Sequence, residues 1–154
     1  MAQFFAIHPD NPQDRLIKQA ADIVRSGGVI VYPTDSCYAL GCKLGDKNAM
    51  ERILAIRKID QKHHLTLMCA DLSELGTYAK VDNAQFRQLK AATPGSYTFI
   101  LQATKEVPNR TLHPKRKTIG LRVPDNATAL ALLQELGEPI LSCTLMLPED
   151  DEPL

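Results

Sequence analysis

The sequence predicts an α/β protein built around one twisted sheet that mixes parallel and antiparallel strands. Strand-like apolar runs alternate along the chain with amphipathic segments of helical length, a pattern typical of this class. The 154 residues are 44% hydrophobic and 23% charged, which is ordinary for a globular protein with a real core. No repeat, low-complexity tract or linker divides them. Residues 1–154 are therefore expected to form a single domain.

Turn and cap residues place the first elements. An apolar run at residues 4–7 is expected to be a short strand. Asn11 and Pro12 then predict a helix start, because asparagine caps helices and proline suits the first helical position. Apolar side chains at helical spacing continue this helix until Gly27 and Gly28 end it.

The next two strands enclose a short polar turn. Val29-Ile30-Val31 leads into Tyr32-Pro33-Thr34-Asp35, and a second apolar run follows. Pro33 is expected to end the pairing, since it has no N–H to donate. Thr34 and Asp35 place side-chain oxygens beyond the end of a strand, where ligands bind in open α/β sheets. The same residue types also build ordinary β-turns, so these residues alone leave a site and a simple turn both open.

Cap signals also place the remaining elements. Asp46 is expected to begin a helix that reaches Arg57, and a strand follows at residues 65–69. Asp71 with Glu74 resembles a capping box for a short helix. The later elements are expected to be a helix at 82–92 closed by Pro94-Gly95, strands at 97–101 and 118–123, a helix opened by Asp125 and ended by Gly137, and a strand at 140–147.

Charge is distributed unevenly, although 18 basic residues balance 18 acidic ones. Six cations and one acid lie between Lys105 and Arg122, whereas the last six residues hold four acids. Anions such as nucleotide phosphates or an RNA backbone are natural partners for this segment, and a solvated loop is the alternative. The candidate RNA-binding residues are Lys105, Arg110, Lys115, Arg116 and Lys117. Arg122 lies inside a strand pattern, so it is expected to face a polar, anion-binding cleft.

Several classes of site are not predicted. The chain has no P-loop, no G-x-G-x-x-G and no G-x-S-x-G motif. Its four cysteines form no C-x-x-C pair, so no metal site is expected and reduced core cysteines are the default. His63-His64 favour a solvated loop over metal binding, because adjacent side chains point different ways. The N-terminus resembles neither a signal peptide nor a membrane span, so a cytoplasmic location without membrane contact is expected.

Four segments together resemble the YrdC/YciO family, whose best-known members are threonylcarbamoyl-AMP synthases. Residues 27–42 are similar to the family's GGV-x-x-YPT-[DE] block, and residues 94–98 to its PG-x-x-T block. Residues 118–124 resemble its S/T-x-x-x-R-x-P strand, and residues 139–144 its P-[LI]-x-S-T-S strand. The match covers nearly the whole chain in the family's order, and its details are most similar to the YciO branch.

The resemblance implies a YrdC/RibB-like twisted sheet with a positively charged concave face. In the synthases this face binds ATP with Mg²⁺, L-threonine and bicarbonate, and releases threonylcarbamoyl-adenylate and pyrophosphate for tRNA modification. It has also been proposed to hold double-stranded RNA. The positions that the resemblance assigns to nucleotide or substrate binding are Thr34, Thr98, Thr118, Arg122 and Ser142.

Departures from the family pattern predict weak or no synthase activity. The K-x-R motif reads Arg57-Lys58-Ile59, and the lysine that follows it falls on His63, beside Lys62. The S-x-N motif reads Thr144-Leu145-Met146, and methionine cannot supply the donor and acceptor of asparagine. Each lost charge-assisted bond to a phosphate weakens binding by about 1.5–3 kcal/mol. Arg57, Lys58 and Thr144 remain the candidate catalytic residues.

Three functions are open at this stage. The favoured one is a YciO-type protein that binds nucleotide, RNA or both in a basic cleft, with weak or no synthase activity. The others are an active threonylcarbamoyl-AMP synthase and a non-catalytic module for double-stranded RNA or tRNA. The family's domain continues beyond the position of Leu154, so the domain is expected to be incomplete at its C-terminus, with a risk of self-association through exposed sheet edges.

Overall fold

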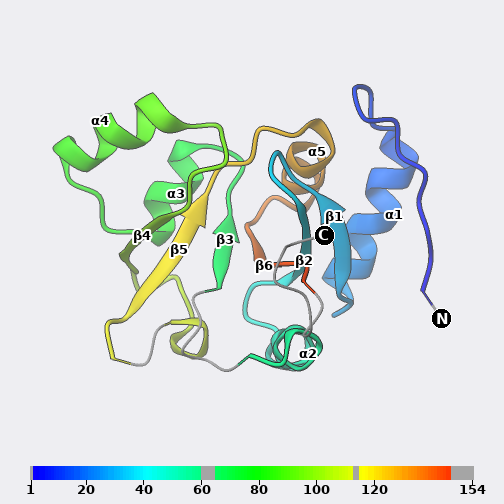
Figure 1. The fold of residues 1–154 in the computed structure, drawn as a ribbon, viewed down its shortest axis with the longest axis horizontal. Coiled ribbons are helices and arrows are strands. Elements are labelled where there is room, and N and C mark those ends of the chain that lie inside the picture. The colour runs from blue at the N-terminus through cyan, green and yellow to red at the C-terminus, as the bar shows by residue number, and fades with distance from the viewer. Residues whose placement is uncertain (1, 60–64, 113–114, 147–154) are drawn as a thin grey trace.

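The computed structural model describes residues 2–59, 65–112 and 115–146. These residues form a six-stranded sheet with helices on both faces (Figure 1). The strands are β1 (Ile30–Pro33), β2 (Tyr38–Lys43), β3 (Thr66–Met68), β4 (Phe99–Gln102), β5 (Thr118–Arg122) and β6 (Ile140–Thr144). The helices are α1 (Asp14–Arg25), α2 (Lys47–Arg57), α3 (Leu72–Tyr78), α4 (Asn83–Ala92), α5 (Ala127–Leu136) and the 3-10 turn η1 (Asn109–Thr111).

The strand order is β1-β2-β6-β3-β5-β4. Only β3 and β5 pair in parallel among the described strands, and the other neighbours are antiparallel. The expectation of a mixed α/β sheet is therefore confirmed. Pro33 lies at the end of β1, which is an edge strand, so its missing N–H removes little from the ladder.

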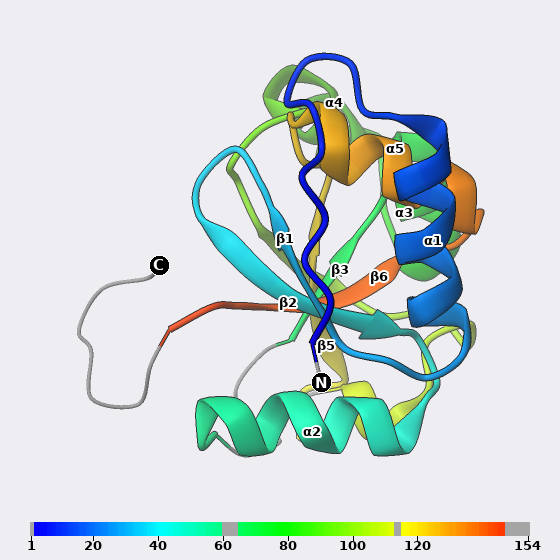
Figure 2. The same cartoon turned by 90° about the vertical axis from the view of Figure 1, so that its right-hand side faces the viewer.

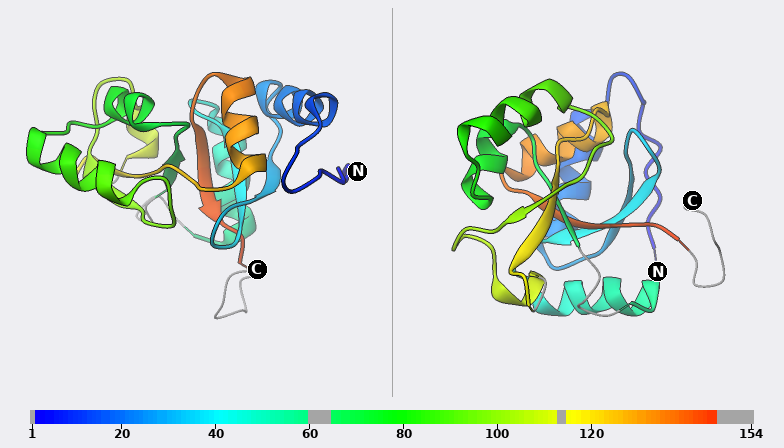
Figure 3. Two further views of the ribbon diagram at one scale, coloured as in Figure 1. Left: turned by 90° about the horizontal axis from the view of Figure 1, so that it is seen from above. Right: turned by 60° about the vertical axis from the view of Figure 1, so that its left-hand side comes forward.

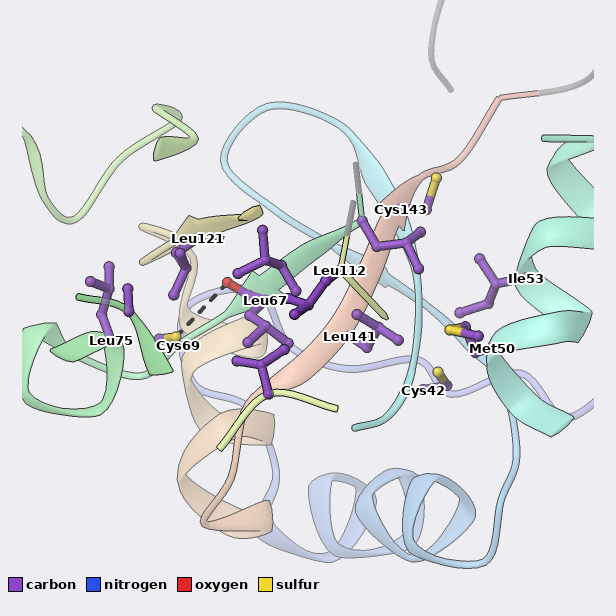
Figure 4. Close-up of a cluster of buried hydrophobic side chains, with 14 of the residues drawn as sticks. Cys42, Met50, Ile53, Leu67, Cys69, Leu75, Leu112, Leu121, Leu141 and Cys143 are labelled. Atoms are coloured by element: carbon purple, nitrogen blue, oxygen red, sulfur yellow. Dashed lines mark hydrogen bonds between the residues drawn. The ribbon is translucent and has the colours of Figure 1, made fainter. Parts of the chain in front are cut away.

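The two faces of the sheet carry two hydrophobic cores. On one face α2, α3 and α4 pack against strand residues such as Leu67, Leu121 and Leu141 (Figure 4). On the other, α1 and α5 pack against Tyr32 and Ile140. These two helices lie side by side, as the view from above shows (Figure 3), and the tip of the β1–β2 hairpin projects away from them (Figure 2). Part of this second face therefore stays uncovered, near the hairpin tip.

Helix caps follow the sequence signals closely. Asp46 accepts a hydrogen bond from the N–H of Ala49, and Asp82 forms a complete capping box with Gln85. Gly137 ends α5 at φ 71°, a left-handed conformation that glycine adopts without strain. Asp71 caps α3 as expected. These contacts are local, which explains why residue spacing alone predicts them.

The N-terminal segment differs from expectation. Residues 4–7 are not a strand: they form no ladder, and Phe5 and Ile7 pack against the second core instead. The first helix begins at Asp14, because the ring nitrogen Nδ1 of His8 accepts from the N–H groups of Asp10 and Asn11 and holds Asn11 in a preceding turn.

Four later details also differ from expectation. Glu74 accepts from the N–H of Ala70 rather than from that of Asp71, so the expected capping box is only half formed. Asn126, one residue later than Asp125, caps α5. β4 begins at Phe99, two residues later than expected, and β6 ends at Thr144, while Leu147 lies outside the described residues.

Gly41 is the position where the sheet tolerates a side chain least. A Cβ atom there would lie 2.7 Å from both the Tyr32 ring and the Ile140 side chain, which are buried. We expect Gly41→Ala to lower the free energy of unfolding by about 1–3 kcal/mol in urea denaturation, because the core is overpacked. Gly76→Ala in α3 is the matched control, since its Cβ meets nothing within 4 Å. Similar midpoints for the two variants would contradict this account.

Candidate functional site

A small pocket of about 40 Å³ lies on the uncovered part of the second face. It is bounded by the turn between β1 and β2, the segment before β4, and the ends of β5 and β6. The lining residues are Thr34, Cys37, Ala39, Thr66, Met68, Thr98, Arg122, Ser142, Cys143 and Thr144. The sheet therefore brings together five of the residues selected from the sequence: Thr34, Thr98, Arg122, Ser142 and Thr144.

The floor of the pocket includes Ser142 and Thr66, which belong to a register row that crosses the sheet. Gly41, Ser142, Thr66 and Gly120 stand opposite one another on β2, β6, β3 and β5, and we call these four residues the glycine–hydroxyl row. The two hydroxyl residues occupy its centre, and a glycine flanks each side. A Cβ on Gly120 would lie 3.0 Å from Thr98 Cγ2 and 3.1 Å from Thr66 Oγ1. The missing side chain therefore lets Thr98 approach Thr66 across β5.

Thr66 is a lining residue that the sequence analysis missed. The sequence does contain a signal for Thr66. Side chains alternate between the two faces along a strand, so Thr66 and Met68 point away from the apolar positions Leu65 and Leu67. A threonine on the second face of a buried strand is typical of a polar pocket floor, but no family motif covers this position.

Thr34 lines the pocket and also closes its turn. Its hydroxyl donates to the carbonyl of Cys37 at 2.5 Å and accepts from the N–H groups of Ser36 and Cys37 at 3.2 and 3.1 Å. The two interpretations of this turn, structural and site-forming, therefore apply to the same side chain. Any ligand that uses the Thr34 hydroxyl competes with bonds that hold the turn.

Arg122 is buried at the end of β5, with 7% of its surface exposed. Its Nε donates to the carbonyl of Gly95 at 3.2 Å, and Nη1 donates to the hydroxyl of Ser36 at 3.1 Å. Nη2 forms an ion pair with Asp35. The carboxylate thus neutralises the guanidinium inside the pocket wall. The sequence placed Arg122 at a polar cleft but gave no sign that Asp35, 87 residues away, is its partner.

Arg57 stands beside the pocket and is engaged with β6. Its Nη1 lies 2.7 Å from Cys143 Sγ and 2.6 Å from the carbonyl of Thr144. Burial raises the pKa of the Cys143 thiol, and the charge and hydrogen bond of Arg57 partly offset that rise. Lys58 is exposed at the C-cap of α2, with φ 52°. Of the three candidate catalytic residues, only Thr144 lines the pocket.

The remaining candidates lie elsewhere. Thr118 is buried at the opposite end of β5 from Arg122, about 13 Å away along an extended strand. The five candidate RNA-binding cations, Lys105, Arg110, Lys115, Arg116 and Lys117, are exposed in the β4–β5 connection, from which β5 rises in Figure 1. Among the described residues, none of these five cations lines the pocket. His63, His64 and Lys62 lie outside the described residues.

Clusters of metal ligands and membrane-spanning helices are both absent from the part of the chain that the structure describes. No group of three or more His, Cys, Asp and Glu residues could hold a metal ion there. None of the helices there has the length and apolar character needed to cross a membrane.

Comparison with known proteins identifies the family. Residues 22–154 match the Sua5/YciO/YrdC family model, whose description is telomere recombination. The YciO protein of Escherichia coli K12, described as uncharacterized, is 69% identical over 148 residues, which cover 96% of this chain and 72% of that protein. The crystal structure of E. coli YciO superposes with a TM-score of 0.95 at 68% identity, covering 98% of this chain and 73% of that one.

More distant relatives have a named activity or ligand. The threonylcarbamoyl-AMP synthase of Chromobacterium violaceum is 37% identical over 135 residues, 87% of this chain and 69% of the synthase. The crystal structure of P. abyssi Sua5 complexed with L-threonine superposes with a TM-score of 0.80 at 27% identity, covering 87% of this chain and 39% of that one. The family match confirms the resemblance first read from the motifs: this chain belongs to the Sua5/YciO/YrdC family.

Proposed function

We propose that this chain is a YciO-type protein that binds a small amino acid, with nucleotide beside it, and has weak or no threonylcarbamoyl-AMP synthase activity. One observation carries the proposal: both arginines at the pocket are already engaged by protein groups. Arg122 is paired with Asp35, and Arg57 contacts Cys143 and the Thr144 carbonyl. A triphosphate is bound by cationic side chains that contact its oxygens. Arg122 and Arg57 would first have to give up the protein contacts described above.

The pocket itself suits a small zwitterion better than a nucleotide. Its volume of about 40 Å³ has room for one small polar group of a ligand, such as a carboxylate, and hydroxyl side chains dominate its polar lining. Because Asp35 neutralises Arg122, the pocket offers hydrogen-bond donors and acceptors more than net charge. The complex of the related P. abyssi Sua5 with L-threonine makes L-threonine the first ligand to test.

The altered motifs support low activity. Ile59, at the position of the synthase arginine, packs against the first core. Position 59 therefore offers a phosphate neither a positive charge nor a hydrogen-bond donor from its side chain. Two or three lost charge-assisted bonds, at about 1.5–3 kcal/mol each, would slow the reaction by several orders of magnitude.

ATP with Mg²⁺ remains the proposed cofactor pair for any residual activity. We infer that Mg²⁺ arrives on the nucleotide phosphates, since this ion is usually held by phosphate oxygens with one or two carboxylates. Among the residues that line the pocket or contact Arg122, Asp35 is the carboxylate, and it is held by the arginine. The fit to a dedicated metal site is therefore poor.

The direct test is pyrophosphate release from ATP that depends on L-threonine and bicarbonate. We expect kcat/KM at least about a hundredfold below that of the C. violaceum synthase assayed in parallel, because the phosphate contacts are lost. We also expect L-threonine to raise the melting temperature, since it binds only the folded chain. Turnover comparable to the synthase would exclude the low-activity proposal, and an unchanged melting temperature would exclude threonine as the ligand.

Releasing Arg122 should increase anion binding. In Asp35→Asn the guanidinium loses its counter-charge but keeps its contacts to Ser36 and Gly95. We expect pyrophosphate to bind about tenfold more tightly in calorimetric titration, the change associated with one charge-assisted hydrogen bond. Asp71→Asn, on the α3 cap, is the matched control and should leave the affinity unchanged. Equal affinities in the wild type and Asp35→Asn would show that Asp35 does not restrain the arginine.

Binding of double-stranded RNA or tRNA is a second candidate function. It is favoured by the five exposed cations gathered in the β4–β5 connection, apart from the pocket. We expect duplex RNA to bind with an affinity that falls steeply with salt, and Lys115→Ala/Arg116→Ala to reduce the slope of log K against log[salt] by about 1–2. Lys18→Ala/Lys47→Ala, on α1 and α2, is the matched control. A slope that stays the same in both double variants would rule out this surface.

A further inference from the structure

Tyr32 reaches across a neighbouring strand to the floor of the pocket. Its hydroxyl is hydrogen-bonded to Ser142 on β6, although β2 lies between β1 and β6 in the sheet. The ring lies over Gly41, the residue of β2 that stands opposite Ser142. A Cβ there would come within 2.7 Å of the ring. The first glycine of the glycine–hydroxyl row thus makes the contact between Tyr32 and Ser142 possible.

The hydrogen bond has a definite direction. Tyr32 is 2% exposed, and within the described residues Ser142 is the hydrogen-bond partner of its hydroxyl. If Ser142 were the donor, the phenol proton would be buried without an acceptor, which is costly. Burial also raises the pKa of Tyr32 far above its ordinary value, with smaller opposing effects from the Ser142 hydrogen bond and the charge of Arg122, so the proton stays on the ring oxygen. Tyr32 therefore donates and Ser142 accepts.

This direction leaves the proton of Ser142 to be used elsewhere. The other hydrogen-bond partner of the Ser142 hydroxyl within the described residues is the carbonyl of Ile140 at 3.5 Å, a distance at the limit of a hydrogen bond. Ser142 lines the pocket, so an oxygen placed there offers a better acceptor. The hydroxyl is thus prepared to donate to a ligand.

We propose that Tyr32 is a positioning residue that holds Ser142 as a hydrogen-bond donor to the carboxylate of a small amino acid in the pocket. The inference rests on the proposed function, since it assigns one contact of the same ligand. A carboxylate fits this place because it only accepts hydrogen bonds and Ser142 has a proton to donate.

A double-mutant cycle with L-threonine tests the proposal. Tyr32→Phe keeps the ring over Gly41 and removes only the hydroxyl. We expect the Kd for L-threonine to rise about tenfold in Ser142→Ala and about three- to tenfold in Tyr32→Phe. The double variant should bind no more weakly than Ser142→Ala alone, because Tyr32 acts through the serine. Tyr38→Phe, an exposed tyrosine on β2, is the matched control and should bind like the wild type.

Two outcomes of the cycle would overturn the inference. One is a double variant whose loss is the product of the two single losses. The other is a Tyr32→Phe variant that binds like the wild type while Ser142→Ala binds weakly. Thermal unfolding of each variant shows whether a loss of binding reflects loss of the fold.

A ligand-free measurement separates this inference from the proposed function. We expect the three-bond couplings of the Ser142 β-protons to report a single χ1 rotamer in the wild type and an averaged one in Tyr32→Phe. If L-threonine does not bind the wild type, the proposed function fails, but these couplings still decide whether Tyr32 positions Ser142. Couplings that are equal in the two proteins, or already averaged in the wild type, would overturn the positioning role.

Discussion

The pocket depends on one buried side chain, that of Arg122. Its guanidinium joins three separate parts of the chain: the end of β5, the turn between β1 and β2, and the loop at Gly95. A charge in this position is tolerated only when it is paired and hydrogen-bonded, because its desolvation is otherwise expensive. Asp35 supplies the charge, while Ser36 and Gly95 supply the remaining acceptors. The groups that make the burial of Arg122 possible therefore also form part of the wall of the pocket.

The same interaction gives the wall of the pocket a structural role that does not depend on any catalytic activity. The arginine and the turn that holds it form one structural unit, so they can be retained for stability alone. The positions that have changed, Ile59 and Met146, lie outside that unit. An apolar residue at position 59 can pack against the first core without disturbing the pocket wall. The fold can thus carry an apolar residue at position 59 and keep the wall of the pocket unchanged.

Local structure was predictable from the sequence, and long-range partners were not. Asp46, Asp82 and Gly137 act within one helical turn, so their spacing was enough to locate α2, α4 and α5. Residues 4–7 had the apolar character of a strand, but a strand also needs a partner, and no local pattern reports one. The same limit applies to Arg122 and Asp35, whose pairing depends on the order of the strands.

The candidate site was predictable to a similar extent. Motif positions identified Thr34, Thr98, Ser142 and Thr144, which the sheet gathers around the pocket. Thr118 shares a face with Arg122 but lies at the other end of β5, so its role in nucleotide binding stays a prediction. The importance of Gly41 and Gly120 also became visible only with the register, which places each beside a central hydroxyl residue.

The glycine–hydroxyl row has a consequence for which parts of the pocket open by local unfolding. Ser142 and Thr66 belong to the two central strands, which are flanked on both sides and can separate only when the sheet itself unfolds. The turn and the loop that Arg122 joins lie outside the ladder and open at lower free energy. A ligand in the pocket would thus contact two central strands that open only with the whole sheet, and a turn and a loop that open locally. Slower hydrogen exchange at the amides of β3 and β6 than at those of the turn and the loop would be the signature of this difference.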